Sequence, residues 1–249
     1  EVVFGDWSSD VCSSDLNAFA TEAAGLAVQR LAQPQTNTTA VVNLALLVGA
    51  QARPETLPQL TQLLASPHPA ARYWAARGLA SEAAKAMAAP NASDILAALK
   101  TAGLAETQPP TLAQILAAMT VPSPAPNNPL VNAAGQAIAE ILKAQADRRA
   151  KLQRIPGAGD VQGFKALADM APAFDEPTRN AAVAAVAYAL GQDLRWFIAN
   201  QPTLDKNTLR EIALLIQAAE QTLRQNLRAV NPTAADRKST RLNSSHRIR

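Results

Sequence analysis

The stretch LPQLTQLLASPHPAARYWAARGLA, Leu57 to Ala80, contains two helical patterns separated by a turn. In its first half, four leucines fall on one face of a helix: Leu57, Leu60, Leu63 and Leu64. Pro67 and Pro69 then interrupt the helix, because proline lacks an amide hydrogen and restricts the residue before it. Helical periodicity resumes over residues 70–80. This stretch therefore predicts two helices joined by a short turn.

The predicted hairpin resembles a HEAT repeat, a helical unit of about 40 residues that stacks on its neighbours. The resemblance is carried by the spaced leucines, by the turn with Pro67, and by a second helix that opens with Ala71 and Arg72. It implies that Trp74 fills the core between repeats and that Arg72 braces the next loop. One hairpin cannot bury its apolar face alone, so neighbouring hairpins are also implied. An ordinary helix-loop-helix within a bundle is the alternative.

Other parts of the chain follow this pattern less closely. Residues 40–50 and 179–191 are similar to second helices of such repeats, whereas residues 88–110 and the long helix over 130–154 depart from a regular repeat. The segment 121–129 has four prolines in nine residues and is expected to be a linker.

The sequence thus predicts an all-α fold, described as an irregular HEAT-like α-solenoid, or helical hairpins followed by a long-helix bundle. Helical repeats are expected over 17–120, the linker over 121–129, and long helices over 130–235. Asp175 and Thr203 are expected to cap the two long helices that follow them.

The two ends differ from the alanine- and leucine-rich sequence between them. One DNA sequence that encodes DRKSTRLNSSH, residues 236–246, reads DWSSDVCSSD on its complementary strand in a shifted frame, which is the sequence of residues 6–15. We therefore expect residues 1–16 and 236–249 to be disordered, translated sequencing-adapter DNA flanking a truncated gene product. Genuine polar tails are the alternative.

The residue inventory argues against several kinds of site. Cys12 lies in the expected flank and His68 is the one histidine between the flanks, so a zinc site or a nucleophilic triad lacks partners. The sequence PGAGD, residues 156–160, lacks the lysine and hydroxyl residue of a phosphate-binding loop and predicts a turn between helices. We expect no catalytic, cofactor-binding or metal-ligating residue, no enzymatic activity, and no membrane span, since no run of 18 apolar residues occurs.

Two groups of side chains are candidates for contact with a partner. Arginine and aromatic residues anchor many protein interfaces, which points to Arg72, Tyr73, Trp74 and Arg77. The densest basic group could contact phosphates, although cations also suit a helix C-terminus: Arg148, Arg149, Lys151 and Arg154.

These features favour a non-catalytic helical-repeat scaffold, or a segment that binds a protein or peptide, with no small-molecule substrate. One alternative is an accessory helical domain of a larger multidomain enzyme. Another is a nucleic-acid-binding helical repeat, which is disfavoured because no aromatic residues interleave with the basic group.

Overall fold

A computed structural model describes residues 9–31, 37–50, 52–121, 124–125, 128–152, 157–201 and 204–230. Within these residues, helices are the only regular secondary structure, which confirms the predicted all-α fold. The α-helices are α1 (Ser9–Leu31), α2 (Thr38–Ala50), α3 (Leu57–Leu63), α4 (Pro69–Ser81), α5 (Ala83–Ala86), α6 (Ala92–Ala105), α7 (Pro109–Ala118), α8 (Pro129–Leu152), α9 (Ala158–Met170), α10 (Glu176–Asn200) and α11 (Lys206–Val230). Two short 3-10 helices are η1 (Pro54–Thr56) and η2 (Ala171–Ala173).

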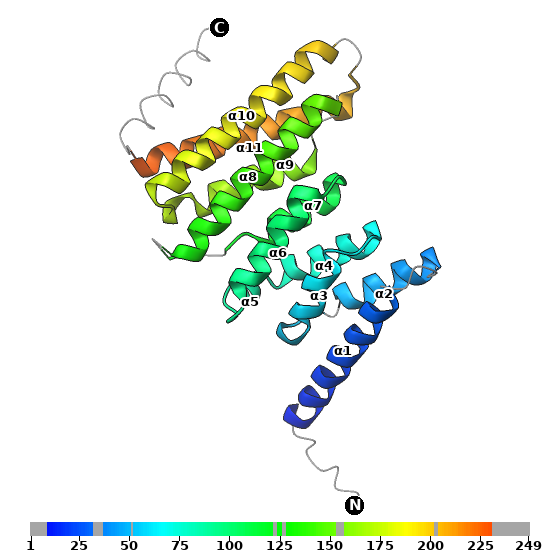
Figure 1. Cartoon of the computed structure of the whole chain (residues 1–249). Coiled ribbons are helices and arrows are strands. Elements are labelled where there is room, and N and C mark those ends of the chain that lie inside the picture. Colours follow the sequence, from blue (N-terminus) through cyan, green and yellow to red (C-terminus); the bar gives the residue numbers. More distant parts are fainter. Residues whose placement is uncertain are drawn as a thin grey trace, which may run out of the picture.

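The helices are arranged as a series of hairpins in two rows. Neighbouring helices in the chain pack as pairs: α1 with α2, α3 with α4, α6 with α7, α8 with α9, and α10 with α11. Each helix also packs on its counterpart in the next hairpin, so α1, α3, α6, α8 and α10 form one row and α2, α4, α7, α9 and α11 form the other. The result is an elongated stack that runs from the N-terminal to the C-terminal end of the chain (Figure 1).

The hairpin predicted over residues 57–80 is present as α3 and α4. The four leucines expected on one helix face are all buried: Leu57, Leu60 and Leu63 in α3, and Leu64 directly after it. Pro69 occupies the first turn of α4, where a missing amide hydrogen costs nothing because that amide has no partner within the helix. The turn and both helices of this stretch therefore follow from the local sequence.

Close approach of α2 and α4 depends on glycine. A Cβ atom placed on Gly49 would lie only 2.6 Å from the Trp74 carbonyl oxygen, so no larger residue fits without moving a helix. Gly78 of α4 lies against the Gly49 carbonyl oxygen and the Leu60 side chain. Small residues at these positions let helix backbones meet, as the alanine-rich composition favours.

The first turn of α10 confirms the predicted cap. The Asp175 carboxylate accepts a hydrogen bond of 2.9 Å from the Thr178 amide, which satisfies one of the free donors of that turn. Thr203 lies outside the described residues. At the start of α11, Asp205 accepts a 2.8 Å hydrogen bond from the Thr208 amide.

Several of the leucines and isoleucines of α11 lie outside its buried face. Leu209, Ile216 and Leu227 are exposed. The residues that face the neighbouring helices recur at spacings of three and four: Ile212, Leu215, Ala219, Thr222 and Asn226. A buried polar position is possible here because the Thr222 hydroxyl donates a 2.7 Å hydrogen bond to the Phe164 carbonyl oxygen of α9.

Helices that precede the predicted linker pack directly on helices that follow it. α6 contacts α8 and α7 contacts α9, and one hydrophobic core includes Leu60, Ile115, Ile138 and Phe164. Four of the nine residues of segment 121–129 lie outside the described residues. The division of the chain into two helical regions joined by a linker stays a prediction.

The described residues correct one detail of the expected N-terminal flank. Residues 9–16, expected to be disordered, form the first turns of α1, and their sequence SDVCSSDL contains neither proline nor glycine to end the helix. Residues 1–8 and 236–249 lie outside the described residues. None of the described helices combines the length and the apolar character that a membrane crossing requires.

Candidate functional site

Three of the four predicted interface residues lie together on α4. The Tyr73 and Trp74 rings meet edge to face, with their centroids 5.5 Å apart. The Arg77 guanidinium lies over the Trp74 ring at 4.9 Å from its centroid, within the range of a cation–π interaction. Trp74 also packs against the hydrophobic core, whereas Arg77 is exposed. The group is thus anchored in the core and open to solvent at its arginine.

Arg72, the fourth predicted residue, belongs to a different cluster. Its Nε donates a 2.8 Å hydrogen bond to Glu106 and its terminal nitrogen donates a second of 3.2 Å. The same guanidinium donates to the carbonyl oxygens of Ser66 and Pro67 in the turn between α3 and α4. Arg72 therefore joins its own turn to the loop of the next hairpin, as the HEAT resemblance implies.

Glu106 is a buried carboxylate with a full set of donors. Its side chain is 1% exposed, and besides Arg72 it accepts hydrogen bonds from the backbone amides of Thr107 and Gln108 at 2.8 and 2.9 Å. Burial alone raises the pKa of this carboxyl group. The hydrogen bonds from Arg72 and the two amides, together with the Arg72 charge, outweigh burial and lower the pKa below its ordinary value.

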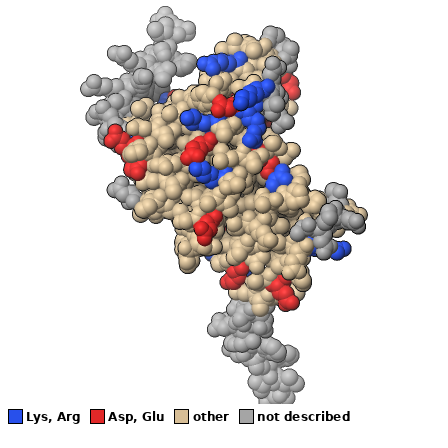
Figure 2. Space-filling model, viewed as in Figure 1, with Lys and Arg blue, Asp and Glu red and all other residues tan. Residues whose placement is uncertain are grey.

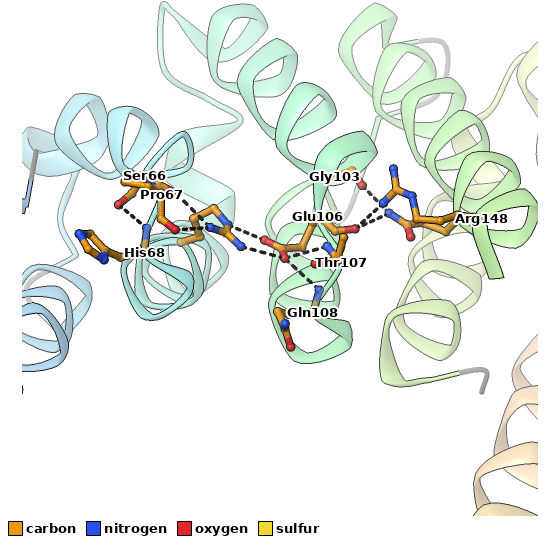
Figure 3. Close-up of polar contacts among 10 residues, drawn as sticks. Ser66, Pro67, His68, Gly103, Glu106, Thr107, Gln108 and Arg148 are labelled. Carbon is orange, nitrogen blue, oxygen red and sulfur yellow. Dashed lines mark hydrogen bonds and ion pairs between the residues drawn. The ribbon is translucent and has the colours of Figure 1, made fainter. Parts of the chain in front are cut away.

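The chain of hydrogen bonds continues into α8. The Gln145 amide donates to the carbonyl oxygens of Gly103 and Glu106 at 2.8 and 2.9 Å. Arg148 donates to the carbonyl oxygens of Leu104 and Glu106 at 2.6 and 2.8 Å. These side chains satisfy carbonyls at the C-terminus of α6, which have no partner within that helix. Figure 3 shows the bonds as a continuous series from the α3–α4 turn through Glu106 to Arg148.

Arg149 takes part in a second buried cluster, which the sequence did not single out. Its guanidinium contacts Asp160 at 2.8 Å and Asp193 at 3.1 Å. All three side chains are largely buried, at 11%, 3% and 4% exposed respectively. Burial raises the pKa of Asp160, and burial together with the Asp160 charge raises the pKa of Asp193 to about 6; the Arg149 charge acts in the opposite direction on both.

The four members of the predicted basic group are not gathered into one exposed patch. Arg148 and Arg149 bond to other parts of the chain, Lys151 is exposed, and Arg154 lies outside the described residues. Arg148 satisfies the C-terminus of α6 rather than that of its own helix. On the face drawn in Figure 2, lysine and arginine are interspersed with aspartate and glutamate, and wide areas carry no charged side chain.

Two hollows flank α6 in the row that contains α3, α6 and α8. The α3–α6 groove has a volume of about 570 Å³, and its walls include Leu64, Ala98, Thr101, Ala102 and the Arg72–Glu106 pair. The α6–α8 groove has a volume of about 640 Å³ and is walled by Leu96, Ala97, Leu130, Ala133 and the ion pair of Lys100 with Glu140, together with neighbouring residues. Both grooves are mostly apolar, with charged groups that already have partners.

The sequence analysis did not identify the three buried acids, Glu106, Asp160 and Asp193. A signal in the sequence was available for Asp193. Asp193 continues the buried positions of α10 at the same helical spacing as Ala182, Val186 and Ala189. Asp160 belongs to the PGAGD stretch, which was predicted to be a turn but already enters α9 at Ala158, and Glu106 lies in the loop before α7. Nothing local in these segments indicates burial. Their role follows from Arg149 and Arg72, which are distant in the chain.

Among the described residues, no group of three or more histidine, cysteine, aspartate or glutamate side chains is placed to hold a metal ion. A scan against protein-family models and searches of curated proteins and of solved structures found no match.

Proposed function

We propose that this chain is a non-catalytic α-solenoid segment that binds an apolar face of a partner protein or peptide in the grooves beside α6. The observation that carries the proposal is the pair of hollows in one row of the helical stack. Stacked helical hairpins offer extended surfaces, and repeat proteins use such surfaces to bind other chains.

The walls of the grooves suit a helical ligand. Ala97, Ala98 and Ala102 present methyl groups, which allow another backbone to come close, and the partly exposed Leu130 adds larger apolar surface. A ligand in the α3–α6 groove would meet Arg72 and Glu106 as a neutral pair rather than as free charges. We therefore infer that the partner supplies an amphipathic helix whose apolar side chains enter the grooves.

The Lys100–Glu140 pair at the α6–α8 groove adds a polar edge. Its nitrogen and oxygen are 2.7 Å apart, and both side chains are substantially exposed. Exposed pairs of this kind add little affinity but penalise a partner that brings a like charge against either member. The pair would thus help to orient a bound helix.

The nucleic-acid alternative receives less support from the contacts of the basic group. Arg148 donates to two backbone carbonyls and Arg149 bonds to two carboxylates, so neither guanidinium is available to phosphates without breaking those bonds. Phosphate contacts by lysine and arginine supply most of non-specific nucleic-acid affinity.

Selection from a displayed library of amphipathic helical peptides tests the proposal. Selected peptides should bind the chain, and the substitution in the groove that a peptide occupies should weaken binding at least tenfold. These substitutions are Thr101→Arg for the α3–α6 groove and Ala133→Arg for the α6–α8 groove, each at an exposed position. Ala184→Arg, at an exposed position of α10, is the matched control and should leave binding unchanged. Failure to select any peptide, or equal loss in all three variants, would count against the proposal.

A further inference from the structure

Three helices meet at the Arg149 guanidinium. Arg149 lies near the C-terminus of α8, Asp160 lies in the first turn of α9, and Asp193 lies in the second half of α10. The Arg149 nitrogens are 2.8 Å from Asp160 and 3.1 and 3.4 Å from the two oxygens of Asp193. One side chain therefore links three helices that belong to two successive hairpins.

The charges in this cluster do not balance when both acids are ionised. One guanidinium faces two carboxylates, all largely buried, which leaves a net charge of −1. An uncompensated charge in a protein interior is costly, and the usual outcome is that the group binds a proton. The charged groups that act on Asp193 are Arg149 from α8 and Asp160 from α9, while Arg210 and Glu211 of the adjacent α11 are exposed.

Of the two acids, Asp193 is held less firmly in its ionised form. Asp160 has the shorter contact to Arg149 and also accepts a 3.3 Å hydrogen bond from the Gly157 amide. It lies at the N-terminus of α9, where the helix dipole favours a negative charge. Asp193 has Arg149 as its hydrogen-bonding side-chain partner and experiences the repulsion of Asp160.

Asp193 is also the last buried residue of α10. Residues 194–200 are partly or fully exposed, and Ile198 is 70% exposed. Where α8 and α10 are joined, the bonded residues are 41 to 44 positions apart: Gln136 with Thr178, Asp147 with Tyr188, and Arg149 with Asp193. Since α8 ends at Leu152, this register leaves the last residues of α10 beyond the end of α8.

We propose that Arg149, Asp160 and Asp193 form a proton-operated joint that fastens the C-terminal turns of α10 to α8 and α9. When Asp193 binds a proton, the cluster is neutral and the joint is closed most firmly. When Asp193 loses the proton, the buried excess of negative charge favours opening, in which Asp193 reaches water.

The direction of the pH effect follows from the two states. In the closed joint the pKa of Asp193 is raised to about 6, whereas in an open joint it approaches the ordinary value for aspartate of about 3.9. Opening then releases a proton between about pH 4 and pH 6, so the opening constant rises up to about tenfold per pH unit across this window. It levels off above pH 6, at about a hundredfold over its value below pH 4.

Amide hydrogen exchange of the whole chain between pH 4 and pH 8, corrected for intrinsic exchange rates, measures this opening. Protection of residues 194–200 should fall as the pH rises to about 6 and then stay level. In Asp193→Asn the protection should be independent of pH. Asp147→Asn, which removes another α8–α10 contact, is the matched control and should keep the wild-type pH profile.

A second measurement needs no variant. The side-chain carboxyl carbon of Asp193, followed by NMR in the wild-type chain, should titrate near pH 6. A midpoint at or below 4, or a pH-dependent protection profile that persists in a folded Asp193→Asn variant, would overturn the proposal.

Discussion

Arg72 and Glu106 form a two-point hydrogen-bonded ion pair across 34 residues of sequence, joining the second helical hairpin to the loop inside the third. The carboxylate is almost fully buried, and the same residue's backbone carbonyl accepts hydrogen bonds from Gln145 and Arg148 of the fourth. One loop thereby connects three successive hairpins through polar contacts that accompany the continuous apolar core.

Removal of Arg72 should destabilise the fold strongly. In Arg72→Met the apolar part of the side chain is kept, but the Glu106 carboxylate loses its cation while it stays buried. Removing one member of a buried ion pair costs about 3–5 kcal/mol of unfolding free energy. The two amide donors that remain on Glu106 favour the lower end of this range. Chemical denaturation measures this loss of unfolding free energy.

The Lys100–Glu140 pair supplies the matched control for that experiment. Both side chains are substantially exposed, at 37% and 57%. Lys100→Met should therefore cost less than about 1 kcal/mol, as exposed ion pairs do. Similar losses in Arg72→Met and Lys100→Met would show that the Glu106 cluster has no special structural role.

Helix packing at Gly49 makes a second prediction. In Gly49→Ala the new methyl group would lie 2.6 Å from the Trp74 carbonyl oxygen, so α2 and α4 must separate. Overpacking of this kind costs about 1–3 kcal/mol. Thermal unfolding should show a lower midpoint for this variant.

Gly25→Ala is the control, because a Cβ atom on Gly25 of α1 would meet no atom within 4 Å beyond the adjacent backbone of its own helix. Alanine favours helix over glycine by about 0.5–1 kcal/mol, so this variant should be slightly more stable than the wild type. A destabilised Gly25→Ala, or an unaffected Gly49→Ala, would contradict the close approach of α2 and α4.

The Glu106 cluster also predicts acid sensitivity. The Arg72 and amide hydrogen bonds outweigh burial and lower the pKa of Glu106, so its contribution to stability is present above the ordinary glutamate pKa. That contribution is lost as the pH falls below about 4.5 and through the lowered pKa. Unfolding free energies measured from pH 7 to pH 2 should fall less steeply at the acid end in Glu106→Gln.

Asp193 acts in the opposite direction, which separates the two clusters experimentally. Its raised pKa means that its contribution is most favourable below the ordinary aspartate pKa and is lost as the pH rises through about 6. A variant at Glu106 should thus alter the profile below about pH 4.5, and one at Asp193 should alter it between about pH 4 and pH 6. An acid profile unchanged by Glu106→Gln would contradict the lowered pKa of that residue.

The sequence predicts correctly those structural features that depend only on residues close together in the chain. The turn at Pro67 and Pro69 and the Asp175 cap need only residues within one helical turn, and both are present. The buried face of α11 could not be predicted in this way. Hydropathy favours leucine over threonine at a buried position. Thr222 is nevertheless buried, because its hydroxyl donates a hydrogen bond to the Phe164 carbonyl oxygen, which is distant in the chain.

The candidate sites show the same distinction. The contact of Trp74 with Arg77 follows from their spacing of three positions on one helix, whereas the contact of the adjacent Tyr73 and Trp74 rings does not. The partners of Arg72 and Arg149 lie 34, 11 and 44 positions away, where spacing within a helix gives no guidance. The stacking of hairpins brings these charges together.

The proposed function makes its most direct prediction about where a selected peptide binds. Hydrogen exchange of the chain, measured with and without a saturating amphipathic peptide, should show added protection beside α6. The protected residues should lie within 61–66 and 98–106 if the peptide occupies the α3–α6 groove, or within 93–100 and 128–140 if it occupies the α6–α8 groove. The folded variant with an arginine in the occupied groove should lose this protection: Thr101→Arg for the α3–α6 groove, or Ala133→Arg for the α6–α8 groove. Protection confined to α10 and α11, with none beside α6, would contradict the account.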